Sequence, residues 1–197
     1  MSDPLTLGVY NTRGEDYRRM MADYALSDEA RARFLDACPP PGRVLDLGCG
    51  PGAYAVHFAE SGHQVDAWDA AEAVLGMVPE HDRIAPRLAR FDDLKAVADY
   101  DGVWAYFSLL HAPRAALPGH LAAIARALKP GGVLFLGMKL GTGGARDALG
   151  RHYEYYAVGE LEALLREAGL TPVDRWEGEG KGLAGEVQPS VVVRADA

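Results

Sequence analysis

Short apolar runs alternate along this chain with longer stretches in which apolar residues recur every three or four positions. The first short run contains Val44, Leu45 and Leu47, and its length suits a buried strand. Further strands are predicted over residues 64–69, 86–91, 99–106, 133–136, 171–176 and 187–194. Helices are predicted over residues 14–38, 53–59, 71–78, 117–128 and 158–168. Strands that alternate with helices in this order favour an α/β fold with a mostly parallel sheet.

Residues 14–38 carry a helical pattern ahead of the first strand. Tyr17 and Met20 recur there at helical spacing, and the run from Ser27 to Glu29 predicts a cap that opens a second helix. Residues 141–157 interrupt the alternation with glycines and then aromatic residues, so we expect a loop or flap. The glycine-rich residues 177–185 predict a mobile connection before the last strand.

Three glycines at every second position, Gly48, Gly50 and Gly52, directly follow the first strand. A ligand can lie against a glycine backbone because no Cβ is present, and glycine adopts positive φ without strain. Pro51 suits the first turn of the next helix, whose free N–H groups can face a ligand. Strand, glycine turn and helix together predict a nucleotide-binding unit.

Two acidic residues accompany this turn. Asp46 lies near the end of the first strand, where a buried carboxylate is costly unless a partner satisfies it. Asp69 follows the glycines by about twenty residues, at the position from which an acid accepts hydrogen bonds from a ribose diol. Gly48, Gly50 and Ala53 also satisfy a dinucleotide-binding pattern. A carboxylate at position 46 would repel a pyrophosphate, however, and would attract an amino group.

The run from Asp46 to Gly52 resembles motif I of the class I S-adenosylmethionine-dependent methyltransferases. Residues 100–105, YDGVWA, and residues 128–132, LKPGG, are similar to later segments of the same family. The resemblance implies an α/β Rossmann-like fold: a seven-stranded, mostly parallel sheet in the order 3-2-1-4-5-7-6 with an antiparallel last strand, helices on both faces and N-terminal lid helices. We expect one domain over 1–197, with a helical lid over 1–41, a cofactor-binding core over 42–139, and a flap, last helix and closing strands over 140–197.

The resemblance implies S-adenosylmethionine as the cofactor and S-adenosylhomocysteine as the product. In the family, the first acid lies by the methionyl amino group, the glycines pass beneath the cofactor and the second acid binds the ribose. The expected cofactor-binding residues are Asp46, Gly48, Cys49, Gly50, Gly52, Asp69, Ala70, Phe91, Asp92, Tyr106 and Phe107. Cys49 is expected to be a small filler of the turn rather than a nucleophile. One of Asp92 and Asp93 is alternatively a helix cap.

The expected substrate-binding residues come from the lid, from the ends of the fourth and fifth strands and from the flap. They are Tyr10, Tyr17, Ser108, His111, Lys139, Tyr153 and Tyr155. His111 is a candidate catalytic base, because a free imidazole titrates near neutrality, and a structural histidine is the alternative. The tyrosines are alternatively packing residues, and Lys139 is either a contact for an anionic substrate or solvated. His63 and Asp66 are expected at the surface.

Composition narrows the classes of partner. The 197 residues are 49% hydrophobic and 24% charged, which suits one globular domain. A net charge of −8 argues against a nucleic-acid partner. We find no secretory signal pattern and no apolar run long enough to span a membrane, and two cysteines favour a reducing cytoplasm. No zinc-type ligand spacing occurs, so we expect no metal, and we expect a monomer or homodimer.

These observations predict an enzyme that transfers a methyl group to an oxygen, nitrogen, sulfur or metalloid atom of a small molecule. The Asn-Pro-Pro-Tyr signature of relatives that methylate nucleic acids and protein amides is missing at residues 106–109. The motifs are most similar to the branch that includes tellurite- and thiopurine-resistance enzymes. Two alternatives stay open: an NAD(P)-dependent oxidoreductase, and a non-catalytic protein that binds S-adenosylmethionine.

Overall fold

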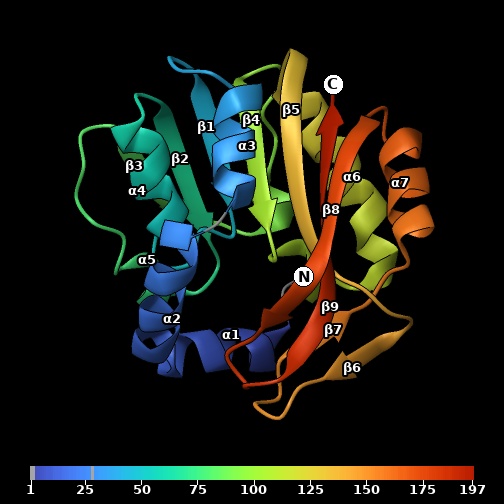
Figure 1. The fold of residues 1–197 in the computed structure, drawn as a ribbon. Helices are drawn as coiled ribbons and strands as arrows, with labels where there is room; N and C mark the ends of the chain where they lie inside the picture. The colour runs from blue at the N-terminus through green and yellow to red at the C-terminus, as the bar shows by residue number, and fades with distance from the viewer. Residues whose placement is uncertain (1–2, 28) are drawn as a thin grey trace.

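Seven strands form the central sheet of the computed structural model, which describes residues 3–27 and 29–197 (Figure 1). They are β1 Arg43–Leu47, β2 Gln64–Asp69, β3 Ile84–Leu88, β4 Tyr100–Tyr106, β5 Leu128–Lys139, β8 Thr171–Lys181 and β9 Val187–Asp196. Their order is β3-β2-β1-β4-β5-β9-β8, which confirms the expected order once the sheet strands are counted along the chain. The first five strands pair in parallel, and β9 runs antiparallel to both neighbours.

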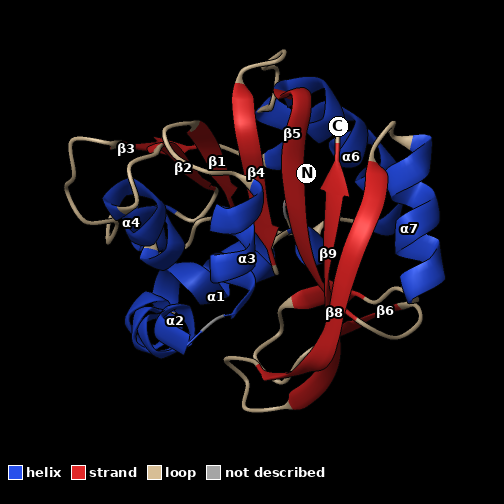
Figure 2. Cartoon of the chain, turned by 45° about the horizontal axis from the view of Figure 1, so that its top comes forward, coloured by secondary structure: helices blue, strands red, loops and turns tan. Residues whose placement is uncertain are grey.

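Helices cover both faces of the sheet (Figures 1 and 2). They are α1 Pro4–Thr12, α2 Gly14–Ser27, α3 Glu29–Ala37, α4 Ala53–Glu60, α5 Glu72–Leu75, α6 Leu117–Ala127 and α7 Val158–Glu167. A two-stranded hairpin, β6 Gly144–Arg146 and β7 His152–Glu154, stands outside the main sheet in the predicted flap. The predicted cap between the two lid helices includes Asp28, which lies outside the described residues.

The alternation of side chains along the strands builds two hydrophobic clusters. On one face, Phe34 of α3 and Phe58 of α4 pack against Trp104 of β4, with ring centroids 4.8–5.4 Å apart. On the other face, Leu121 of α6 and Leu161 of α7 pack in the cluster that contains strand residues 103 and 134. Each large side chain that is fully buried contributes roughly 1.5–3 kcal/mol to folding. The sheet is therefore held rigidly from both sides.

Three local expectations differ from the structure. Helix α1 lies in the expected lid but ahead of the helical pattern over residues 14–38; Asp3 caps it by accepting the N–H of Thr6 at 2.9 Å. The third strand ends at Leu88 rather than at residue 91. This edge strand is mostly exposed, with Leu88 56% exposed, so its sequence lacks the alternation of buried and exposed residues that would define its ends. Residues 177–181, expected in a mobile connection, extend β8 and pair with β9, Lys181 lying opposite Val187.

Two polar residues expected at the surface are packed inside. His63 is fully buried, close to Gly42, at the start of β2. Asp66 is partly buried because its carboxylate accepts hydrogen bonds from Arg43 at 2.8 Å and from the hydroxyl of Tyr100 at 2.8 Å. Both corrections come from neighbours that are distant in the sequence, so local polarity could not reveal them.

The carboxyl ends of β1, β2 and β4 meet at one edge of the sheet, which faces α1 and α2 at the bottom of Figure 1. At this edge the turn after β1 approaches the turn after β4. Gly48 has a φ of +85°, and a Cβ built on it would lie 2.3 Å from the Cβ of Ser108. The hydroxyl of Ser108 donates to the carbonyl of Leu47 at 2.5 Å. Only glycine fits at position 48.

We expect Gly48→Ala to destabilise the protein more than Gly131→Ala does. Gly131 has a similar φ of +79°, but a Cβ added there would meet no atom within 4 Å, so its substitution isolates the cost of backbone strain, roughly 1–3 kcal/mol. Gly48→Ala adds the overlap with Ser108. Urea unfolding of both variants measures the difference. Equal losses of unfolding free energy would show that the Ser108 contact does not constrain the turn.

Candidate active site

Two adjoining cavities open at the carboxyl edge of the sheet. The first, about 770 Å³ including space open to solvent, lies between α1, the glycine turn and the end of β2. The second, about 1250 Å³ on the same measure, lies between the lid, the flap and the β8–β9 hairpin. Both are lined by Tyr10, Tyr17, Phe107 and His111. These four side chains form the wall where the cavities meet.

Asp69 faces the first cavity from the end of β2. Its carboxylate accepts the backbone N–H groups of Gly50 and Ala71, each at 2.8 Å. Burial raises the pKa of Asp69, while these hydrogen bonds oppose the rise. Ala70 lines the same cavity beside it. This carboxylate is fixed in place and can accept hydrogen bonds from a diol.

Asp46 is the buried acid of β1, and only 2% of its surface is exposed. Its Oδ2 atom has no hydrogen-bond partner among the described residues. Burial, with a smaller effect of Asp69, raises the pKa of Asp46 to about 8. A buried acceptor without a partner costs about 1–3 kcal/mol. An ammonium group at the glycine turn would remove that cost, so the residue fits the amino end of the expected cofactor.

The lid covers the glycine turn through Tyr17 of α2. A Cβ at Gly50 would lie 2.8 Å from Cε1 of Tyr17, so this ring rests directly on the backbone of the turn. Tyr17 in turn contacts Tyr10 edge to face, with ring centroids 5.0 Å apart. Cys49 of the same turn is buried within a hydrophobic cluster, and burial raises the pKa of its thiol well above the ordinary value. These surroundings are consistent with the expected filler role, since a nucleophilic thiol needs a lowered pKa.

The far end of the first cavity is formed by the short turn after β3. Phe91 and Asp92 line it, and the ring of Phe91 contacts His120 of α6 edge to face. Asp93 instead accepts the backbone N–H of Arg90 at 2.8 Å and caps the turn. The two neighbouring acids therefore have different roles: Asp93 is the cap, and Asp92 faces the cavity.

The residues after β4 fall on both sides of the shared wall. Tyr106 lines only the second cavity, where its ring stacks on Trp104 at 4.6 Å. Phe107 lines both cavities and has a φ of +54°, which is strained for a residue with a Cβ. Ser108 lines the first cavity, but its hydroxyl is already engaged by the carbonyl of Leu47.

His111 is held in one tautomer by its neighbours. Its Nδ1 lies 2.6 Å from the carbonyl oxygen of His152, which can only accept, so Nδ1 carries the proton. Its Nε2 therefore accepts the hydroxyl of Tyr10 at 2.9 Å. Burial lowers the pKa of His111 to about 3, so the ring is neutral. A substrate proton can reach Nε2 only through Tyr10 or after Tyr10 moves.

Arg151 is the residue that local sequence patterns did not single out. It is 2% exposed, donates to Tyr10 at 2.9 Å and binds Asp147 through Nη2 and Nε at 2.7 and 2.9 Å. The pair closes the base of the flap. An acid and an arginine four residues apart inside a glycine-rich loop were the only signal in the sequence.

Aromatic and charged side chains both line the second cavity. Tyr54, Tyr153 and Trp176 join the shared wall in its lining. The ammonium group of Lys139 lies 3.9 Å from the centre of the Tyr153 ring. Tyr155, predicted to bind substrate, lies outside the lining of both cavities and rests against Gly141.

Metal ligands do not gather at this edge of the sheet or elsewhere in the described chain. Within residues 3–27 and 29–197, no group of three or more histidine, cysteine or acidic side chains is placed to hold a metal ion. None of the helices in this part of the chain combines the length and apolar character needed to cross a bilayer.

Comparisons with known proteins agree with this geometry. A family model described as a methyltransferase domain matches residues 16–175. Ubiquinone biosynthesis O-methyltransferase of Xanthomonas axonopodis pv. citri (strain 306) is 32% identical over 154 residues, which are 67% of this chain and 64% of that protein. The protein of the same name from Xanthomonas oryzae pv. oryzae (strain PXO99A) is 36% identical over 101 residues, 48% of this chain and 41% of its own length. The matches thus span less than two thirds of these relatives.

Solved structures show the same fold. One is 1,6-didemethyltoxoflavin-N1-methyltransferase of Burkholderia thailandensis, with 1,6-didemethyltoxoflavin and S-adenosylhomocysteine bound. It has a TM-score of 0.80 and 26% identity, covering 98% of this chain and 87% of that chain. A methyltransferase from Methanosarcina mazei has a TM-score of 0.72 at 17% identity, covering 82% of this chain and 94% of that chain. The chain therefore belongs to the class I S-adenosylmethionine-dependent methyltransferase family.

Proposed function

We propose that this protein methylates a small aromatic molecule, with the cofactor in the first cavity and the acceptor in the second. The observation that carries this proposal is the shared wall of Tyr10, Tyr17, Phe107 and His111. A methyl group delivered from one cavity to the other must pass this wall. The aromatic lining of the second cavity supports a flat, largely apolar acceptor.

The side chains of the first cavity support S-adenosylmethionine as the cofactor. Asp69 lines the cavity and accepts hydrogen bonds from the ribose hydroxyls. Asp46 is buried outside the lining, near Asp69, and accepts a hydrogen bond from the amino group of the methionyl part. Phe91 and Asp92 lie where the adenine would end. Because the unpaired oxygen of Asp46 attracts an ammonium group and repels a pyrophosphate, this arrangement disfavours a dinucleotide.

When bound, the cofactor supplies an activated methyl group on a sulfonium, so the protein mainly aligns the acceptor with it. Such positioning supplies up to roughly 7–11 kcal/mol of a barrier. At the wall, the hydroxyl of Tyr10 donates to Nε2 of His111 and accepts a hydrogen bond from Arg151. An acceptor proton transferred to Tyr10 moves the Tyr10 proton to Nε2 of His111.

The relatives support a small-molecule acceptor. The Burkholderia structure holds one, 1,6-didemethyltoxoflavin, and the Xanthomonas proteins are named as O-methyltransferases. Oxygen and nitrogen are therefore the acceptor atoms that we favour here. We also propose a cytoplasmic monomer or homodimer without a nucleic-acid partner, since the net charge is −8 and the cysteines Cys38 and Cys49 are free and buried.

We expect S-adenosylmethionine and S-adenosylhomocysteine to raise the thermal midpoint of the protein, because a ligand that binds only the folded state stabilises it. NAD should leave the midpoint unchanged. Release of S-adenosylhomocysteine across a panel of phenols and nitrogen heteroaromatics then measures turnover. A shift with NAD alone would support the oxidoreductase alternative, and binding without turnover on any acceptor would support the non-catalytic one.

We expect Asp69→Ala to weaken binding of S-adenosylhomocysteine by about 1–3 kcal/mol, because the ribose hydroxyls lose their buried acceptor. Titration calorimetry measures the change in Kd. Asp66→Ala is the matched control: it removes a hydrogen-bonded carboxylate from the same strand, away from the cavity. Equal affinities in the two variants would contradict the assigned role of Asp69.

Binding of S-adenosylhomocysteine should strengthen as the pH rises from 6 to 8. In the free protein Asp46 keeps its proton up to a pKa of about 8, whereas the ligand ammonium favours the ionised carboxylate. Binding therefore releases a proton below that pKa, which changes Kd by up to about tenfold per pH unit. Calorimetry in buffers of different ionisation enthalpy counts the protons. Asp46→Asn should remove most of the slope; an unchanged slope in that variant would refute the assignment.

A further inference from the structure

Lys139 stands at the carboxyl end of β5 and lines the second cavity. Its ammonium group lies over the ring of Tyr153, 3.9 Å from the ring centre. The same ring also contacts His111, whose ring centre lies 4.6 Å away, and Arg151, whose guanidinium carbon lies 5.2 Å from the ring centre. Tyr153 thus links Lys139 to the wall where methyl transfer is proposed.

The other cations that line the second cavity are Arg33, Arg151 and Lys181, and each of them has an interaction among the described residues. Arg151 binds Asp147 at 2.7 Å, and Arg33 at the cavity rim binds Glu29 at 2.5 Å. Lys139 differs from them, since no carboxylate of the described residues forms an ion pair with it. Burial and the charge of Arg151 lower the pKa of Lys139, although Asp147 and Glu186 oppose this effect. The cavity therefore holds a cation whose charge the protein does not neutralise by contact.

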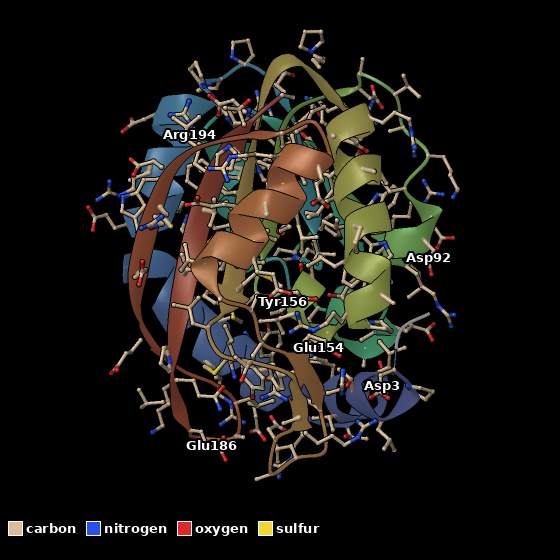
Figure 3. The ribbon with its side chains drawn as sticks, turned by 90° about the vertical axis from the view of Figure 1, so that its right-hand side faces the viewer. Asp3, Asp92, Glu154, Tyr156, Glu186 and Arg194 are labelled. Carbon is tan, nitrogen blue, oxygen red and sulfur yellow. The ribbon has the colours of Figure 1, made fainter. Side chains whose placement is uncertain are left out.

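The β8–β9 hairpin lies beside Lys139 and contributes Gln188, whose side-chain oxygen is unpaired within the described chain, to the cavity lining. A Cβ at Gly182 would lie 3.6 Å from Nζ of Lys139 and 3.9 Å from Nη2 of Arg151, so both cations border one backbone position. Gln188 lines the cavity too, and its buried Oε1 has no hydrogen-bond partner among the described residues. Figure 3 shows Glu186 at the hairpin tip, at the same end of the molecule as Asp3 of the lid.

We propose that Lys139 binds a carboxylate of the methyl acceptor, which makes the acceptor an aromatic acid. This inference rests on the proposed function and names the substrate class of the same site. The carboxylate pairs with the ammonium group on one side of Tyr153, and the nucleophilic atom lies toward Tyr10 and His111 on the other. A lining cation that forms no ion pair with a described carboxylate matches a monoanion, and the aromatic rings beside it match the aromatic body.

The rim acids do not cancel this attraction. Glu177 and Glu179 are exposed on β8, and Glu177 is paired with Arg175 at 3.4 Å. Charge pairs at an exposed rim are screened by water and salt, whereas the half-buried Lys139 is screened less. The attraction between an acceptor anion and Lys139 is therefore expected to exceed its repulsion by Glu177 and Glu179.

The test uses three probes that differ only in the group opposite a phenol: 4-hydroxybenzoate, 4-hydroxybenzamide and 4-hydroxyphenyl phosphate. Each is titrated at pH 7 into the full-length protein saturated with S-adenosylhomocysteine. We expect the benzoate to bind at least tenfold more tightly than the amide. Lys139→Met should remove this preference, and Lys139→Arg should keep it. Lys129→Met, at the opposite end of β5 and paired with Asp101 at 2.7 Å, is the matched control and should behave as wild type.

Several outcomes would overturn the proposal. They are equal binding of benzoate and amide, no binding of either to the loaded protein, tightest binding of the phosphate, or an undiminished preference in Lys139→Met. Binding of S-adenosylhomocysteine is measured first in every variant. Failure at that first step counts against the proposed function, whereas normal loading without discrimination counts against the role of Lys139 alone.

Discussion

The close approach of two turns, after β1 and after β4, is the constraint on which the site depends. Ser108 fills the space that a side chain at position 48 would need, and its hydroxyl binds the carbonyl of Leu47. This contact places Phe107 in a strained conformation on the wall between the cavities. The same glycine turn carries Gly50, whose N–H is held by Asp69. One backbone contact thus sets the relative positions of Asp69, the shared wall and the second cavity.

Around this contact, the protein holds buried or half-buried titratable groups that form no ion pair with a described residue. Asp46 and Asp69 lie near each other with raised pKa values, and Lys139 stands in the second cavity without an ion pair to a described carboxylate. Buried charges of this kind reduce stability unless a partner arrives. Carboxyl groups lie at the first cavity and a cation in the second, which suits the proposed amino group at one and the proposed anion in the other. Binding of both proposed ligands would offset the cost of burying these groups.

The sequence predicted the parts of the site that are local in the chain. The glycine turn, Asp69 and the strand order followed from short motifs and from the family resemblance. The wall could not be predicted in this way, because Tyr10 meets His111 across 101 residues and Arg151 across 141. The ends of β3 were also predicted wrongly from local polarity, because this exposed edge strand has no buried face that would define them. Helix α1 has a capping residue, Asp3, but lacks a strong apolar stripe, so its sequence carries little helical signal.

The hydrogen bonds of the wall bear on how an acceptor loses its proton. Protonated His111 would keep both partners, donating to the His152 carbonyl and to Tyr10, yet Arg151 and Lys139 oppose a further positive charge. Arg151, which donates to the hydroxyl of Tyr10, would favour the ionised form of a phenol or heterocycle bound at the wall and so lower its pKa. Under the proposed function, an acceptor in this cavity would be activated mainly by the field that surrounds it. Tyr10 and His111 would then align the acceptor and receive its proton only transiently.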